Sequence, residues 1–107
     1  MLITTTNSIE GKQIVEYKGL VFGEIIAGSN FIRDFFAGIT DFIGGRSGAY
    51  ESRLTRGREE ALAEMKENAQ KLGANAIVGV EVNYTTITSE SKSMFMIVAS
   101  GTAVVVR

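Results

Sequence analysis

A glycine-rich turn holds the clearest candidates for binding chemistry in this sequence. Two glycines precede Arg46 and Ser47, and a long stretch with helical periodicity follows, beginning near Tyr50 and Glu51. Backbone N–H groups at the start of a helix attract anions, and Arg46 and Ser47 would add a guanidinium and a hydroxyl group. The spacing matches neither the phosphate-binding P-loop nor the dinucleotide fingerprint. The turn therefore indicates either a small-anion site that includes these four residues, or simply a sharp connection between two helices, which glycine permits.

Glu81 is the second candidate, because it lies between Val80 and Val82 in a strand-like segment. A carboxylate in a buried strand costs free energy unless it is paired, so Glu81 could bind a ligand at a subunit boundary. The alternative is that its face of the strand is solvated. Further carboxylates lie among basic residues on the second predicted helix, a pattern typical of an exposed helix face: Glu59, Glu60, Glu64 and Glu67.

The sequence contains no histidine and no cysteine. The usual proton shuttle, the thiolate nucleophile and the favoured zinc ligands are therefore missing, and we expect no enzyme activity. Met94 and Met96, with Met65, could supply thioether ligands for Cu(I). Methionine is also a common filler of irregular cores, and core packing is the simpler interpretation.

Composition limits the remaining functions. The 107 residues predict one domain, 1–107, and 11 basic against 12 acidic residues leave no basic footprint for nucleic acid. No stretch is long and apolar enough for a transmembrane segment, and the N-terminus has no signal-peptide pattern, so we expect a cytoplasmic protein. A hydrophobic content of 45% is high for so small a chain, which favours burial of apolar surface between copies of itself.

Hydrophobic periodicity and glycine punctuation predict the elements. Strands are expected over residues 2–6 and 13–27, with Gly19 and Gly23 marking a bulge, a bend or the close approach of another backbone. Helices are expected over 31–43 and 47–72, with Gly73 as a stop, and a hairpin over 76–88 and 94–106. In that hairpin, alternation puts Val78 and Val80 on one face and Glu81 on the other. The order β-β-α-α-β-β predicts an α+β fold with a mostly antiparallel sheet and both helices packed on it.

Three segments in combination resemble the YbjQ-like family: residues 43–51 (IGGRSGAYE), 72–80 (LGANAIVGV) and 99–104 (ASGTAV), with residues 28–30 leading into Arg33 and Asp34. The similarity covers essentially the whole chain. It implies a dodecin-subunit-like fold assembled as a ring of five, in small prokaryotic proteins of uncharacterised function with a heavy-metal-binding description. Because cysteine and histidine are absent, any metal would take oxygen ligands from Glu81, Glu51, Asp34 or Asp41 at subunit boundaries, or the methionine pair.

These observations favour a non-catalytic homo-oligomeric domain that binds a metal ion or small anion where subunits meet. No cofactor is identified beyond a metal ion as one candidate. The alternative is a structural ring scaffold that presents its surfaces to another protein and holds no small ligand.

Overall fold

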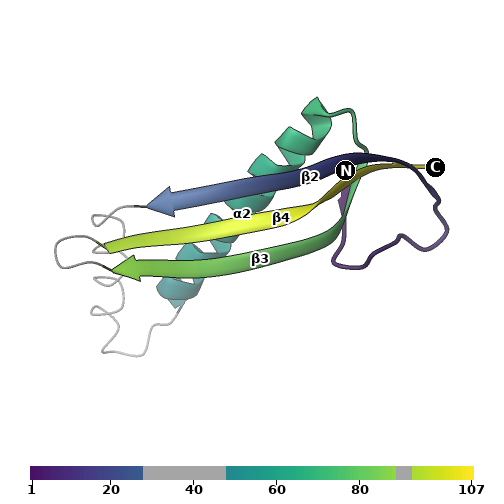
Figure 1. The fold of residues 1–107 in the computed structure, drawn as a ribbon. Coiled ribbons are helices and arrows are strands. Elements are labelled where there is room, and N and C mark those ends of the chain that lie inside the picture. Colours follow the sequence, from purple (N-terminus) through teal and green to yellow (C-terminus); the bar gives the residue numbers. More distant parts are fainter. Residues whose placement is uncertain (28–47, 89–92) are drawn as a thin grey trace.

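The computed structural model describes residues 1–27, 48–88 and 93–107. The elements in chain order are β1 (Leu2–Ile3), β2 (Ile14–Ala27), α2 (Gly48–Lys71), β3 (Ala76–Thr88) and β4 (Ser93–Val106). The three long strands lie side by side, and the helix lies against one side of them (Figure 1). The predicted second helix and the predicted C-terminal hairpin are both confirmed, with boundaries that agree to within one residue.

The predicted β-β-α-α-β-β order with a mostly antiparallel sheet is wrong. The described part of the chain forms one helix and a four-stranded mixed sheet in β-β-α-β-β order, and the helix expected over 31–43 lies outside the described residues. The sheet order is β1-β3-β4-β2, with β1 parallel to β3 and the two other pairs antiparallel. The first two strands lie at opposite edges of the sheet, so they do not form the antiparallel hairpin that neighbours in sequence usually make.

Helix α2 packs on the sheet through small side chains and one methionine, one turn apart. Ala61, Met65 and Ala69 are all 0% exposed. Opposite them lies Gly23 of β2, where an added Cβ would be only 2.7 Å from the backbone nitrogen of Met65. The close backbone approach predicted at Gly23 is thus confirmed. The helix ends at Lys71, and the predicted stop Gly73 follows it with a φ of 83° and donates its N–H to the carbonyl oxygen of Gln70 at 3.0 Å.

A bulge interrupts β3 near its middle. Between Val78 and Glu81 this strand advances three residues while the paired segment of β4, Thr102 to Ser100, advances two. Gly79 lies within the extra stretch with a φ of 61°, a left-handed conformation that a side chain disfavours.

The bulge decides which face each side chain of β3 takes. Val78 packs with Ala76 and Val104 on the face away from α2, whereas Val80 belongs to the core beneath the helix. The prediction that Val78 and Val80 share a face is therefore wrong, because the extra residue breaks the strict alternation of the strand.

Candidate functional site on the uncovered sheet face

The sheet face opposite α2 carries a row of exposed apolar side chains along β2. Tyr17 pairs with Val104, which lies in the cluster on the face away from the helix, and the register then places the following alternate side chains of β2 on this same face. Four large side chains result, with exposed fractions of 70% for Tyr17, 72% for Leu20, 47% for Phe22 and 54% for Ile26. We call these four residues the apolar stripe.

Between Leu20 and Ile26, β2 is apolar on both of its faces except at Glu24. Val21, between Leu20 and Phe22, is 3% exposed, and Ile25 packs against the core under α2. A strand that is apolar on both faces is typical of burial on both faces. The stripe is the feature that the sequence analysis missed, although the unbroken apolar run around Phe22 is the signal that could have revealed it.

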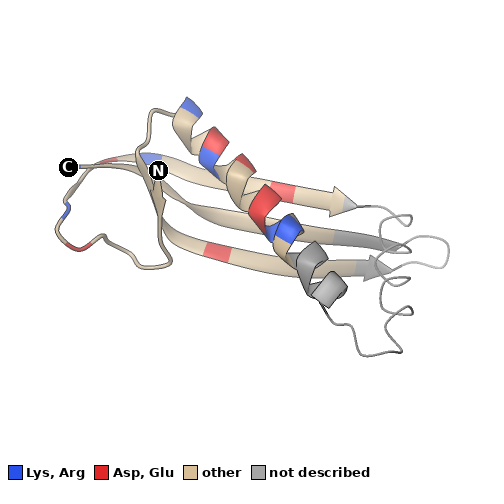
Figure 2. Cartoon of the chain, turned by 180° about the vertical axis from the view of Figure 1, so that it is seen from behind, with Lys and Arg blue, Asp and Glu red and all other residues tan. Residues whose placement is uncertain are grey.

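Charged residues gather along α2, while the strands beneath it carry few (Figure 2). No element of the described residues other than the sheet itself lies on the face opposite α2, and we call it the uncovered face. Two carboxylates interrupt it, Glu24 on β2 and Glu81 on β3, and both are exposed. The ion pairs found among the described residues are Lys18–Glu16 at 2.9 Å and Lys71–Glu67 at 3.8 Å. Neither pair includes Glu24 or Glu81, so the two carboxylates of this face have no basic partner within the described part of the chain.

Glu24 and Glu81 do not complete a cation site within one chain. Strand β4 lies between them, and their β4 partners, Val98 and Ser100, are two residues apart. Strand spacing and rise put their Cα atoms about 12 Å apart, so both reach one ion only when both side chains extend toward each other. Ca²⁺ takes about six to eight oxygen ligands, many more than two carboxylates supply. Over residues 1–27, 48–88 and 93–107, no group of three or more His, Cys, Asp or Glu could hold a metal.

The side chains of the other predicted site residues lie outside the described ones. Arg46 and Ser47 lie outside the described residues. Tyr50 and Glu51 belong to the first turns of α2, and only their backbone is described. Of the five predicted residues, Glu81 is thus the one whose side chain is placed. It lies exposed on the uncovered sheet face.

Of the three methionines considered as a thioether site, Met65 and Met96 lie on opposite faces of the sheet, and the side chain of Met94 lies outside the described ones. Met65 is fully buried beneath α2, with Ile97 in the same core. Met96 precedes Ile97 in β4 and pairs with Ile26 of the apolar stripe, so it lies on the opposite face. Met65 and Met96 therefore cannot bind the same ion within one chain.

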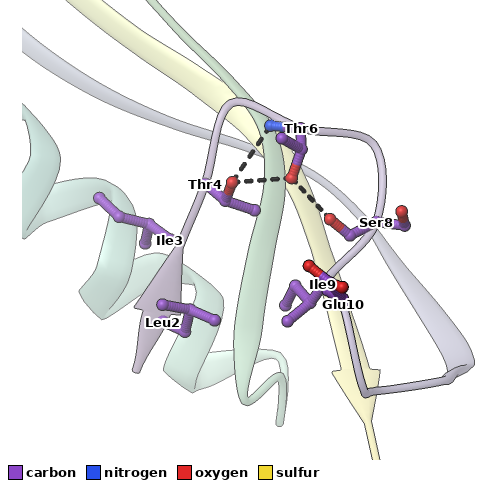
Figure 3. Close-up of a pocket in the computed structure, with 7 residues that line it drawn as sticks. All are labelled: Leu2, Ile3, Thr4, Thr6, Ser8, Ile9 and Glu10. Atoms are coloured by element: carbon purple, nitrogen blue, oxygen red, sulfur yellow. Dashed lines mark hydrogen bonds between the residues drawn. The ribbon is translucent and has the colours of Figure 1, made fainter.

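A cavity of about 520 Å³ lies beside the N-terminal segment (Figure 3), lined by Leu2, Ile3, Thr4, Thr6, Ser8, Ile9 and Glu10. The Thr6 hydroxyl donates to the carbonyl oxygen of Ser8 at 2.6 Å, so in the 2.8 Å contact between the two threonine hydroxyls Thr4 must donate. The Thr4 hydroxyl oxygen also accepts the Thr6 backbone N–H at 3.2 Å. Because these hydroxyls bond to neighbouring groups of the same segment, the cavity offers a ligand few free polar groups.

Fold and site together define a small α+β domain in which a helix covers one face of a mixed sheet and the other face presents apolar side chains. The chain belongs to the YbjQ family, whose model, described as "Putative heavy-metal-binding", matches residues 1–107. The resemblance noted from the sequence is confirmed. No helix within the described segments is long and apolar enough to cross a membrane.

Relatives of known sequence and structure agree with this membership. The chain is 78% identical to a UPF0145 protein of Pasteurella multocida over 107 residues, which is 100% of both chains. It is 63% identical, again over 100% of both chains, to a UPF0145 protein of Actinobacillus pleuropneumoniae. A crystal structure from Pediococcus pentosaceus, of a protein of unknown function in the DUF74 family, matches with a TM-score of 0.65 and 19% identity over 100% of this chain and 98% of that one. That likeness supports the fold alone.

Proposed function

We propose that the protein is a non-catalytic domain that works as a homo-oligomer and binds a metal ion or small anion where its subunits meet. The apolar stripe on the uncovered sheet face carries the proposal. A second copy of the chain is the occupant that we assign to this face. The family resemblance sets five as the expected number of chains.

The size of the stripe supports an interface. Large side chains each present about 150–250 Å² when free, so the four exposed fractions correspond to roughly 500 Å² of accessible surface. Burial of that surface contributes at most about 12 kcal/mol at roughly 25 cal/mol per Å². A standard interface buries about 800 Å² on each partner, so the stripe would form more than half of one side. Contacts around the stripe would supply the remainder.

Two properties of the chain favour a second copy over a foreign partner. A chain of this size leaves a large part of its surface accessible, and 45% of its residues are hydrophobic. The net charge of −1 is close to zero, so identical copies approach one another with little repulsion.

The ligand and the absence of catalysis are supported by the kinds of side chain present. Glu81 and Glu24 lie on the face that we assign to the interface, and further copies would supply the ligands that one chain lacks. The sequence contains no histidine or cysteine to act as base or nucleophile. A cytoplasmic location stays a prediction from the sequence.

Light scattering after gel filtration tests the proposal. We expect the wild-type protein to be an oligomer and Phe22→Asp to shift it toward a monomer, because a carboxylate buried in the interface would lack a partner. Leu72→Asp is the matched control, since Leu72 is 44% exposed at the end of α2, away from the stripe. An unchanged mass for Phe22→Asp would refute the assigned interface. A monomeric wild-type protein would favour the alternative, a scaffold that binds another protein.

A further inference from the structure

We infer that this chain has no site for a soft or borderline heavy-metal ion, in contrast to the description of its family, and that a cation held by the protein is bound through oxygen atoms. The inference states which class of ion the proposed site would bind. It rests on the proposed function only in so far as several subunits combine to bind that ion. The inference follows from the kinds of metal ligand that one chain contains. Assembly of identical chains increases the number of these ligands but adds no new kind.

The strongest soft-metal ligands are missing from every copy. Zinc and the metals that resemble it are bound in proteins mainly by thiolate and imidazole groups, whereas carboxylate and carbonyl oxygens suit magnesium, calcium and manganese. The whole sequence has no cysteine and no histidine, so no arrangement of identical chains creates a thiolate or imidazole ligand.

Methionine thioethers are the remaining soft ligands, and one of them is buried in the core. The sequence has four methionines. Met65 is 0% exposed between α2 and the sheet, where the sulfur serves packing and no ion can reach it without unfolding. Met96 lies on the other side of the sheet, paired with Ile26 and Thr85 of the neighbouring strands. The thioethers of Met65 and Met96 in one chain therefore do not converge on one ion.

Oxygen ligands are abundant by comparison. The chain has 12 acidic residues, and Glu24 and Glu81 are exposed on the face assigned to the interface. Hard cations accept such ligands together with water, so they need no residue that this sequence lacks.

Equilibrium dialysis of the wild-type protein against Cd²⁺ or Zn²⁺, in the presence of excess Mg²⁺, tests the inference by elemental analysis of the retained protein. We expect cadmium and zinc retention at background level, because the thiolate and imidazole ligands that favour these metals are missing and excess Mg²⁺ competes for carboxylate oxygens. Retention close to a whole number of ions per assembly would overturn the inference.

A second arm with Cu(I) addresses the thioethers directly. We expect the same low copper retention by wild-type protein, by Met96→Leu and by the control Met65→Leu, since methionine and leucine have similar volumes. Stoichiometric copper retained by the wild type would overturn the inference, and its loss in Met96→Leu but not in Met65→Leu would identify Met96 as a ligand. Light scattering on the same samples separates the two proposals: a monomer that retains no cadmium refutes self-association and supports the metal inference. An oligomer that retains cadmium supports self-association and refutes the metal inference.

Discussion

Replacement of Gly23 by alanine is expected to lower the free energy of unfolding by about 3 kcal/mol or more, the upper range for overpacking of a well-packed core. Gly23 lies in β2 at the point where α2 crosses it most closely. The substitution adds one methyl group and removes no atom that makes a contact. The change in the free energy of unfolding therefore measures how much room lies between the helix and the sheet at this position.

The magnitude follows from the atoms that the new methyl group would meet. A Cβ at Gly23 would lie 2.7 Å from the backbone nitrogen of Met65, 2.9 Å from the carbonyl carbon of Ala61, and closer still to the carbonyl oxygen of Ala61. Backbone atoms of a helix cannot rotate away, so α2 would have to move off the sheet by about 1 Å, a gap that forfeits up to roughly half of the dispersion attraction across it. Ala61, Met65 and Ala69, all 0% exposed, would lose contacts together.

Gly57→Ala is the matched control, because it adds a methyl group on the helix side of the same helix–sheet interface, opposite β4. Its Cβ would lie 2.6 Å from Cδ1 of Ile97, the far end of a flexible side chain that can rotate. Alanine also exceeds glycine in helix propensity by about 1 kcal/mol, so we expect little net change. Urea unfolding followed by circular dichroism, at one fixed chain concentration, compares the variants. A Gly23→Ala protein within about 0.5 kcal/mol of wild type would refute the close backbone packing.

The remaining predictions concern the sheet. Gly79→Ala should lower the free energy of unfolding by about 1–2 kcal/mol, since Gly79 has a φ of 61° and no atom within 4 Å of an added Cβ, so backbone strain is the only penalty. Gly79→Asn should cost less, because asparagine tolerates this conformation, and equal losses for both variants in urea unfolding would contradict the strain argument. Asn75→Ala should lower stability by about 1 kcal/mol, because the Asn75 amide donates to the Val106 carbonyl at 3.0 Å and accepts the Val106 N–H at 2.8 Å. Hydrogen exchange at Val106 should then accelerate, and unchanged exchange would show that the amide does not hold this strand end.

Local patterns in the sequence were sufficient to predict α2 and the C-terminal hairpin. The four-residue spacing of Ala61, Met65 and Ala69 marks the buried side of the helix, and Gly73 ends it. These features depend on residues close together in sequence, where propensity and periodicity act directly.

Features that depend on distant residues could not be predicted. The parallel pairing of β1 with β3 joins Leu2 to Ala76, and a two-residue strand has no pattern that names its partner. The bulge at Gly79 could not be predicted, because Val78 and Val80 are spaced as in a regular strand although the extra residue puts them on opposite faces. Of the candidate site, the exposure of Glu81 could not be derived from Val80 and Val82, since burial of one face says nothing about cover on the other.

The apolar stripe also could not be predicted from the local sequence alone. The run around Leu20, Phe22 and Ile26 was recognised as a strand, but its two-sided apolar character becomes informative only when the helix is seen to cover one face. The surplus of apolar residues in the composition predicts that some apolar surface is buried against a partner, and that partner stays a prediction.

A native mass spectrum of the wild-type protein tests the central claim, that copies of this chain cover the uncovered sheet face, most directly. We expect a discrete homo-oligomer, with five chains as the number that the family resemblance implies. A spectrum that shows only the 11.5 kDa monomer would contradict it, because the apolar stripe would then remain exposed in solution.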